Sequence, residues 1–503
     1  MYVERERWAR EAWFWAFSLC LAYVFFYLTT HKRPPLTLTA AVGFVALGVV
    51  THMALKKAKS TLYLIFLFLP FFPFLRIQII RYEIVGYTVM FIAARWTEFL
   101  MLLSLLGRKL GGVRRILYSA PLLDFLILAY VLVGLVYLGK AVRGGNTFMG
   151  LWGLKDQFLF FTYYALVRFI PLGKEDLKRF LTISALIAAA IAAFGALQAQ
   201  FLGDGFLRTL GYGIDIPGTG LTYVDPSYKR TFPGGISFIR AISILQDALS
   251  LGAYLMVFLL ILQPFYFMPE RKDWRLAKRF LYFILLLGLF YTTTRSAWIG
   301  TAAGTLYLGW RGKRLLVTSS VFLLLGAVFL LLLLSFPGGK QFLLGSFFQA
   351  DEASLTGHLS KYGWQFQTML DNPLGLGLGM TGRVGIQFGS VLQGGFNTEC
   401  WYLQVGTQMG VLGFALYVGI TLETLRKLFL LGLRLRDPFL RDLADGVFAA
   451  YLACALFAIS LNVWQCHLIP IFIHLFVGMA IFHFPFLDGG QPAQENAVPA
   501  RAA

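Results

Sequence analysis

One arginine of the sequence stands among hydroxyl side chains, in the segment Tyr291-Thr-Thr-Thr-Arg295-Ser-Ala-Trp298. A guanidinium presents a planar fork of N–H donors that can bind two phosphate oxygens at once. The segment lies between two short apolar runs, so we expect Arg295 at a membrane surface, where it could hold a phosphate group. The alternative is an arginine that extends from an apolar helix toward lipid headgroups and binds no substrate.

A second basic group precedes this arginine. Lys229 and Arg230 lie in a polar segment, and Arg240 follows where the next apolar run begins. Three cations at one edge of a membrane segment suit an anionic ligand held at the surface. Contact with lipid headgroups is the competing interpretation, because anionic lipids attract the same side chains.

Further candidate residues lie in the polar stretch 336–397. His358 is a candidate proton carrier, although an isolated loop histidine is more often only solvated, and Lys361 and Trp364 follow closely as candidate substrate contacts. Residues 372–379 then alternate glycine with leucine after an Asn-Pro pair. This run lacks a following Lys-Ser or Lys-Thr, so it is not a phosphate-binding P-loop. Alternating glycines more simply permit a tight turn.

Glu399 is the candidate general base. It stands between a polar stretch and the next apolar run, directly before Cys400, Trp401 and Tyr402. A carboxylate that is partly removed from water there would suit proton abstraction from a hydroxyl. The alternative is an acid near a helix N-terminus, where the helix dipole favours negative charge. Trp401 and Tyr402 could stack against sugar rings, although aromatic residues are also common as anchors at membrane interfaces.

The composition requires that a membrane positions these residues. The chain of 503 residues is 58% hydrophobic and only 14% charged, whereas an ordinary soluble domain has about 25% charged residues. Its long apolar runs approach or exceed the roughly 18 residues that cross a hydrocarbon core as a helix. The strand alternation of a membrane barrel is absent. The expected fold class is therefore all-α, a polytopic membrane helical bundle.

The apolar runs and charged breaks predict about fourteen transmembrane helices. We expect one membrane domain over residues 1–488, with two long loops on the same outer face at about 202–241 and 336–397. Residues 489–503 are rich in Gly, Pro, Ala and polar residues, and we expect them to form a disordered cytoplasmic tail.

The basic residues predict the orientation. Net charge is +19, but the cations fall in short connectors between apolar runs, which argues for membrane topology and against a nucleic-acid partner. Placing most of the 44 Lys and Arg inside puts both termini in the cytoplasm and both long loops outside. The four cysteines have no paired spacing, so neither a disulfide framework nor a metal site is predicted.

Four motifs, in order, resemble the superfamily of O-antigen polymerases and O-antigen ligases. They are Arg240 with the downstream Gly-Ala-Tyr-Leu, the Thr-Thr-Arg295-Ser-Ala-Trp segment, the stretch from Gly-His358 to the alternating glycines, and Glu399-Cys-Trp-Tyr-Leu-Gln followed by Gly410-Val-Leu-Gly. The ligases typically have histidine at the place where this chain has Glu399. An acidic residue there is more similar to the polymerases, so the resemblance favours a polymerase.

The resemblance implies a metal-independent glycosyltransferase of the bacterial cytoplasmic membrane, with no cofactor and with its active site facing outward. It implies a donor glycan on undecaprenyl diphosphate, a lipid-linked glycan as acceptor, membrane lipids as surroundings and a chain-length regulator as a partner protein. Arg240 and Arg295 would then stabilise the diphosphate leaving group, and Glu399 would accept the proton of the acceptor hydroxyl. The alternatives are a ligase that transfers the glycan to lipid A core, a protein O-glycosylase, or a flippase that performs no chemistry.

Overall fold

The computed structural model describes residues 58–81, 120–212, 228–231, 237–266, 272–312, 352–387, 398–466 and 468–489, with isolated positions between 326 and 334. The chain divides into two compact units, Met1–Leu110 with Ile214–Leu221 and Gly111–Gly213 with Thr222–Ala503. The spans expected before residue 58, between 82 and 119 and near 325 lie outside the described residues, as does the tail after residue 489. The single domain over residues 1–488 stays a prediction.

The described part of the smaller unit is an interrupted apolar helix. It comprises α3 (Ala58–Phe68), a 3₁₀ turn (Leu69–Phe71) and α4 (Phe72–Arg81). Pro70 lies in the 3₁₀ turn and a second proline follows at the start of α4. Proline has no backbone N–H to donate and its ring crowds the preceding turn, so the regular α-helical hydrogen bonds are broken here.

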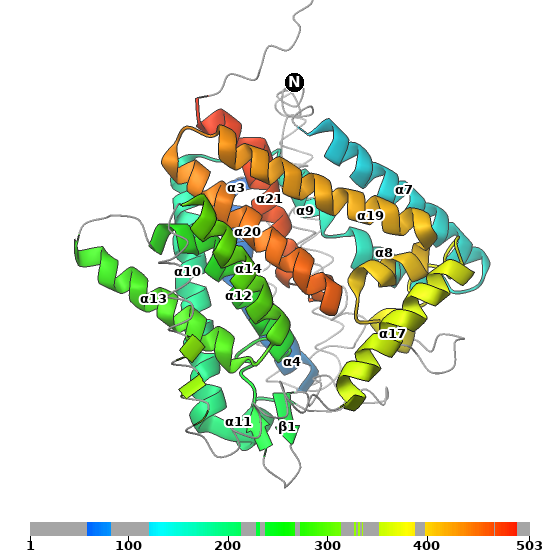
Figure 1. Cartoon of the computed structure of the whole chain (residues 1–503), viewed down its shortest axis with the longest axis horizontal. Helices are drawn as coiled ribbons and strands as arrows, with labels where there is room; N and C mark the ends of the chain where they lie inside the picture. Colours follow the sequence, from blue (N-terminus) through cyan, green and yellow to red (C-terminus); the bar gives the residue numbers. More distant parts are fainter. Residues whose placement is uncertain are drawn as a thin grey trace, which may run out of the picture. The chain divides into compact units, whose positions relative to one another are not determined.

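The larger unit consists mainly of helices and contains one small hairpin (Figure 1). Its helices are α7 (Pro121–Arg143), α8 (Thr147–Phe158), α9 (Phe161–Val167), α10 (Lys174–Leu197), α11 (Gly203–Thr209), α12 (Ala248–Tyr266), α13 (Lys272–Tyr291), α14 (Arg295–Arg311), α17 (Glu352–Asp371), α18 (Gly382–Gln387), α19 (Trp401–Arg434), α20 (Pro438–Ser460) and α21 (Leu468–Leu487). A π-helical turn (Gln198–Leu202) follows α10, and a 3₁₀ turn (Val463–Gln465) precedes α21. The antiparallel strands β1 (Lys229–Thr231) and β2 (Ser237–Ile239) form the hairpin.

The helical membrane fold predicted from the sequence is confirmed, whereas the count of about fourteen spans is not. Within the described residues, six helical segments are long and apolar enough to cross a membrane by length and composition. These are Pro121–Arg143, Lys174–Thr209, Ala248–Tyr266, Trp401–Arg434, Pro438–Ser460 and Leu468–Leu487. The second long loop of the prediction, residues 336–397, contains two helices, α17 and α18.

Helices α14 and α20 lie side by side (Figure 1). The contacts near the two ends of α14 define the two ends of the larger unit. Near the start of α14, the Ser296 and Ser460 hydroxyl oxygens are 2.7 Å apart. Near its other end, Arg311 Nε lies 3.1 Å from Asp445 Oδ1. Gly300 and Gly304 allow the close approach, since a Cβ on either would lie 3.1 Å from a carbonyl oxygen of α20. Small residues four apart commonly permit such contact between membrane helices.

The ends of α10 and α13 meet the segment before α12 at one of these two ends. At the end marked by Ser460, the Gln198 amide oxygen accepts from the Ser243 backbone N–H (2.7 Å). There too the Ala241 N–H donates to the Tyr291 carbonyl (2.9 Å), at the end of α13. We call this the Ser460 end, and the opposite one the Asp437 end.

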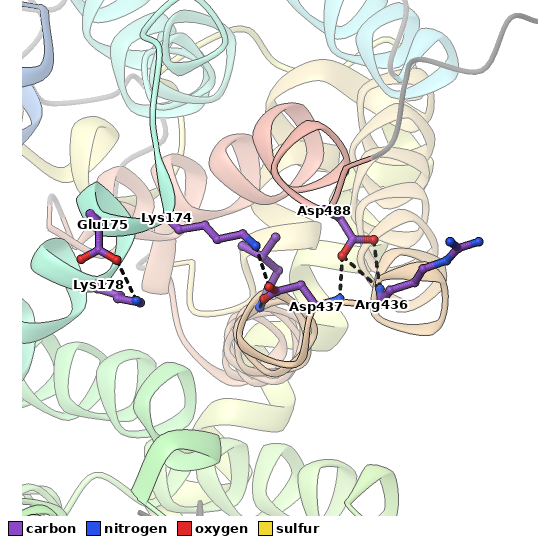
Figure 2. A network of polar contacts seen from close by, with 7 residues as sticks. Lys174, Glu175, Lys178, Arg436, Asp437 and Asp488 are labelled. Carbon is purple, nitrogen blue, oxygen red and sulfur yellow. Dashed lines mark hydrogen bonds and ion pairs between the residues drawn. The ribbon is translucent and has the colours of Figure 1, made fainter.

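Figure 2 shows a polar network at the Asp437 end. Lys174 Nζ lies 2.6 Å from Asp437 Oδ2, and the Asp437 backbone N–H donates to Asp488 Oδ1 (2.6 Å). Asp437 Oδ1 also accepts from the Leu440 N–H (3.0 Å) and so caps α20. The hydrogen bond from Lys174 holds the pKa of Asp437 below its usual value. The start of α10, the start of α20 and the end of α21 are thereby tied together.

Candidate functional site

Residues 460–462, which we call the 460–462 segment, join three parts of the larger unit at the Ser460 end. The Ser460 hydroxyl contacts Ser296 of α14, and its carbonyl accepts from the Tyr362 hydroxyl of α17 (3.3 Å). The Asn462 side-chain amide donates to the carbonyl of Thr398, just before α19. Segments separated by as many as 164 residues in the sequence therefore meet here.

Each of these contacts lies next to a residue that the sequence singled out. Arg295 precedes the α14 contact, Lys361 precedes the α17 contact, and Glu399 follows the contact before α19. The fold therefore brings Arg295, Lys361 and Glu399 near the 460–462 segment, since each of them is adjacent in sequence to a residue that contacts it. The prediction that Arg295 and Glu399 act at one outer face of the membrane stays a prediction.

Glu399 forms an ion pair with Lys361. Glu399 Oε1 lies 2.6 Å from Lys361 Nζ, and the side chains are 10% and 40% exposed, respectively. The acid directly precedes Cys400, the N-cap residue of α19, whose side chain makes no capping hydrogen bond. Its position near the start of the helix agrees with the dipole interpretation as well as with a base role. The lysine was predicted as a substrate contact, and its pairing with the acid was not foreseen.

The segment that leads into Glu399 is held by buried amides. The Gln404 amide oxygen accepts from the Thr398 hydroxyl (2.6 Å) and from the Asn462 amide (2.8 Å). Thr398 and Gln404 are almost wholly buried. Hydrogen bonds in such an environment hold a segment rigidly, because losing one would leave a buried polar group unsatisfied.

Arg240 is buried against the turn that leads into Arg295. Its Nε donates to the Thr292 carbonyl (2.9 Å), and its Nη2 donates to the Thr294 hydroxyl (2.9 Å). That hydroxyl lies 3.1 Å from the Ala248 carbonyl of α12 and donates to it. These hydrogen bonds place Arg240 against the turn of residues 292–295. The sequence-based expectation that Arg240 contacts a substrate directly stays a prediction.

Backbone strain marks the same turn. Thr293 in this turn has a φ of 49°, and Ser243, in the segment before α12, has a φ of 56°. Neither residue is glycine, and both side chains are buried. Non-glycine residues in this region cost on the order of 1–3 kcal/mol and persist where the surrounding structure enforces them. Thr292 and Thr294 supply such enforcement through their contacts with Arg240. The turn is therefore held in one specific shape at the start of α14.

Arg295 itself is the first residue of α14 and is partly exposed. A helix N-terminus carries partial positive charge and unsatisfied N–H donors, which favour an anion. The N-cap residue, Thr294, makes no side-chain capping bond. A guanidinium at this position can therefore act together with the helix terminus on one anionic group.

The alternating glycines support a kink in α19. The helix is interrupted at Gly410, whose φ is 69° and ψ is −170°. In a regular helix the Val411 N–H would bond the Thr407 carbonyl, but here it donates to the Pro373 carbonyl (3.0 Å), while the Leu376 N–H donates to Thr407 (2.8 Å). The Gly-rich segment thus replaces helical hydrogen bonds that the kink removes. This role is structural, in agreement with the tight turn predicted from the sequence.

Lys229 and Arg230 lie at the hairpin, apart from the contacts of Arg240 with the turn of residues 292–295. Lys229 is exposed at the hairpin, and its Nζ lies 3.6 Å from Asp204 Oδ2. Burial and the hydrogen bond to Asp204 raise the pKa of neighbouring Tyr228 to about 12, so this phenol stays neutral. Arg230 follows in β1, with its side chain outside the described residues. No contact of the described residues links Lys229 to the 460–462 segment, so it stays a separate candidate.

The predicted aromatic contacts differ in accessibility. Trp401 is fully buried and packs at 5.9 Å from Tyr417, ring centroid to ring centroid. It therefore cannot stack on a sugar in this conformation, and that prediction is wrong for this residue. Tyr402 is partly buried, and its hydroxyl donates to the Ala455 carbonyl (3.1 Å). Trp364 is partly exposed on α17 and remains a candidate sugar contact.

His358 lies in α17, three residues before Lys361. Its side chain is outside the described residues, so its candidate role as a proton carrier stays a prediction. Within the parts of the chain that are described, no group of three His, Cys, Asp or Glu side chains is placed to hold a metal ion.

The sequence reasoning missed the residues that position the site. Ser460, Asn462 and Gln404 lie in or beside apolar runs and have no motif of their own. One signal was available, because polar side chains inside membrane segments are costly and usually have a partner. Which partners they have depends on how distant helices pack.

Comparison with protein families places part of the chain in a known family model. Residues 280–418 match the family model described as O-antigen ligase. This segment begins within α13 and ends within α19, and it includes Arg295, Lys361 and Glu399. A comparison with curated proteins found no match.

Proposed function

We propose that the chain joins lipid-linked glycan units into a surface polysaccharide. The match of residues 280–418 to the O-antigen ligase family model supports a place in the superfamily of O-antigen ligases and polymerases. The donor is a glycan on undecaprenyl diphosphate, and the acceptor is a sugar hydroxyl of a second lipid-linked glycan. The observation that carries the proposal is the 460–462 segment, which gathers Arg295, Lys361 and Glu399 at one end of the bundle.

The proposed reaction is a displacement at the anomeric carbon of the donor. The acceptor oxygen forms a bond to that carbon, the bond from carbon to the diphosphate oxygen breaks, and the hydroxyl proton passes to Glu399. Negative charge develops on the leaving diphosphate, where Arg295 and Lys361 stabilise it. Arg240 contributes by holding the turn that carries Arg295. These cations perform the role that a metal ion has in many reactions with diphosphate leaving groups.

A polymerase is favoured over a ligase by Glu399. The ligases of this superfamily typically have histidine at the matching place, whereas this chain has a carboxylate. A ligase that transfers the glycan to lipid A core is the second candidate, because the matched family model is described by that activity.

The proposed location is the outer face of a bacterial cytoplasmic membrane, with both termini in the cytoplasm. Basic residues at the Asp437 end support this orientation, because positive charges favour the cytoplasmic side. They include Lys174, Lys178, Arg179, Arg311, Arg434, Arg436 and Arg441. The Ser460 end would then face outward. A chain-length regulator remains a proposed partner.

Incubation of the purified protein in lipid nanodiscs with a lipid-linked repeat unit tests the proposal. Gel sizing of the lipid-linked product should show a ladder of multiples of the repeat. Transfer to added lipid A core without a ladder would instead indicate a ligase. An unchanged substrate that crosses the bilayer of sealed vesicles would favour a flippase and contradict both transferase proposals.

A further inference from the structure

Lys361 covers the proposed base. Glu399 Oε1 lies 2.6 Å from Lys361 Nζ, and a general base needs the proton that it abstracts within about the same distance. In this arrangement Glu399 is not ready to accept a proton from a sugar hydroxyl.

The two partners of this ion pair differ in freedom to move. Glu399 follows Thr398, which is held by Gln404 and Asn462, and the acid is only 10% exposed. Lys361 is 40% exposed on α17 and carries its charge on a flexible four-carbon stem. If the pair opens, the lysine is therefore the partner that moves.

A lipid diphosphate is a stronger competitor for this lysine than the carboxylate is. The diphosphate of a glycosylated lipid carries two negative charges at neutral pH, and Coulomb attraction at a given distance scales with charge. The 460–462 segment contacts Tyr362, next to Lys361, and Ser296, next to Arg295. An anion held by Arg295 would therefore lie at the same end of the bundle as the lysine.

We propose that Lys361 is shared between Glu399 and the donor diphosphate. It pairs with Glu399 before the donor binds, moves to the diphosphate when the donor arrives, and so uncovers the base only when a leaving group is in place. The donor therefore binds before the acceptor hydroxyl is activated. This inference rests on the proposed function, because it needs a donor with a diphosphate at the Ser460 end.

Binding of farnesyl diphosphate to the full chain in nanodiscs, measured by calorimetry, tests the sharing. Glu399→Gln removes the competitor for Lys361 and should tighten binding about tenfold, which corresponds to about 1.4 kcal/mol. Lys361→Met should weaken binding about tenfold. In the double variant, Glu399→Gln should change the Kd by less than about twofold relative to Lys361→Met alone, because the shared group is gone.

A matched ion pair at the Asp437 end serves as control. Lys178 Nζ lies 2.7 Å from Glu175 Oε1 on the surface of α10, and Glu175→Gln should leave the Kd unchanged. Glu399→Asp keeps the charge on a shorter side chain and should tighten binding less than Glu399→Gln does. It serves as the second variant if Glu399→Gln does not fold.

Three results would overturn the inference. Equal tightening by Glu399→Gln with and without Lys361 would mean simple repulsion between the acid and the diphosphate. An unchanged Kd in Glu399→Gln would mean that the ion pair does not compete with the ligand, while the proposed glycan transfer could still be intact. If the parent protein does not bind farnesyl diphosphate at all, both this inference and the diphosphate role in the proposed function are wrong.

Discussion

Replacing Arg240 by lysine separates a residue that positions the site from one that contacts the substrate. The guanidinium donates from Nε to the Thr292 carbonyl and from Nη2 to the Thr294 hydroxyl. Lysine keeps the charge but ends in one compact ammonium, which cannot reproduce both directions of the fork. At least one hydrogen bond from a charged donor to the turn is therefore lost.

The size of the effect follows from that loss. Hydrogen bonds to charged groups contribute about 1.5–3 kcal/mol, and a buried carbonyl left without its donor keeps the desolvation cost. The destabilised turn carries Arg295 at the start of α14. If the whole loss appears in the transition state, turnover by Arg240→Lys falls about 10- to 150-fold.

The assay compares Arg240→Lys with Arg295→Lys in nanodiscs. Turnover is followed by sizing of the lipid-linked product, and stability by the midpoint of thermal unfolding. We expect both variants to lose turnover, since lysine also lacks the fork that grips two phosphate oxygens. Only Arg240→Lys should lower the unfolding midpoint, because Arg240 is buried in contacts with the protein and Arg295 is partly exposed.

Three outcomes would contradict this reasoning. Turnover of Arg240→Lys within about twofold of the parent would mean that the turn of residues 292–295 keeps its shape without the guanidinium. An unchanged unfolding midpoint together with lost turnover would instead mean that Arg240 contacts the substrate directly, as the sequence first suggested. Near-normal turnover of Arg295→Lys would remove the diphosphate role of that residue.

Three further predictions concern other parts of the molecule. Glu399→Gln should lower the turnover rate constant about 10²- to 10⁴-fold if the carboxylate is the base, and activity within a few-fold of the parent would leave it a helix-terminal acid. Gly410→Ala should destabilise the fold by at least about 1–3 kcal/mol, because its φ is 69° and a Cβ would collide with the Pro373 carbonyl; Gly139→Ala, with open space around its Cβ, is the neutral control. Asp437→Asn should lower the unfolding midpoint at pH 7, but the difference should close as pH falls below about 4, because a lowered pKa stabilises the fold only while the parent carboxylate stays ionised. A pH-independent difference would contradict this last expectation.

The candidate site residues could be chosen from the sequence because their residue types are costly in a membrane. An arginine among threonines and a glutamate before an aromatic pair stand out in a chain with 14% charged residues. The glycine run was also interpreted correctly as a tight turn, since glycine accepts positive φ where other residues are strained. Gly375, Gly377 and Gly379 all have positive φ in the structure.

Other assignments could not be made without the fold. Trp401 and Tyr402 are neighbours with similar aromatic side chains, yet Trp401 is fully buried and Tyr402 only partly. A helix turns about 100° between successive residues, so neighbours face different partners, and the packing of α19 decides which of them faces inward. The sequence indicated that a helix begins here but not how it is rotated.

The sequence alone determined that the chain is a helical membrane protein. Hydropathy depends only on the residues of each segment, and a backbone that crosses lipid must satisfy its hydrogen bonds within the segment, as a helix does. It also determined which cations and carboxylates were available for chemistry. Only the tertiary structure decided that Lys361 pairs with Glu399 and that Arg240 holds the turn before Arg295. Those pairings join residues 38 and 52 positions apart, and distances of that kind depend on how whole helices pack, which no local pattern encodes.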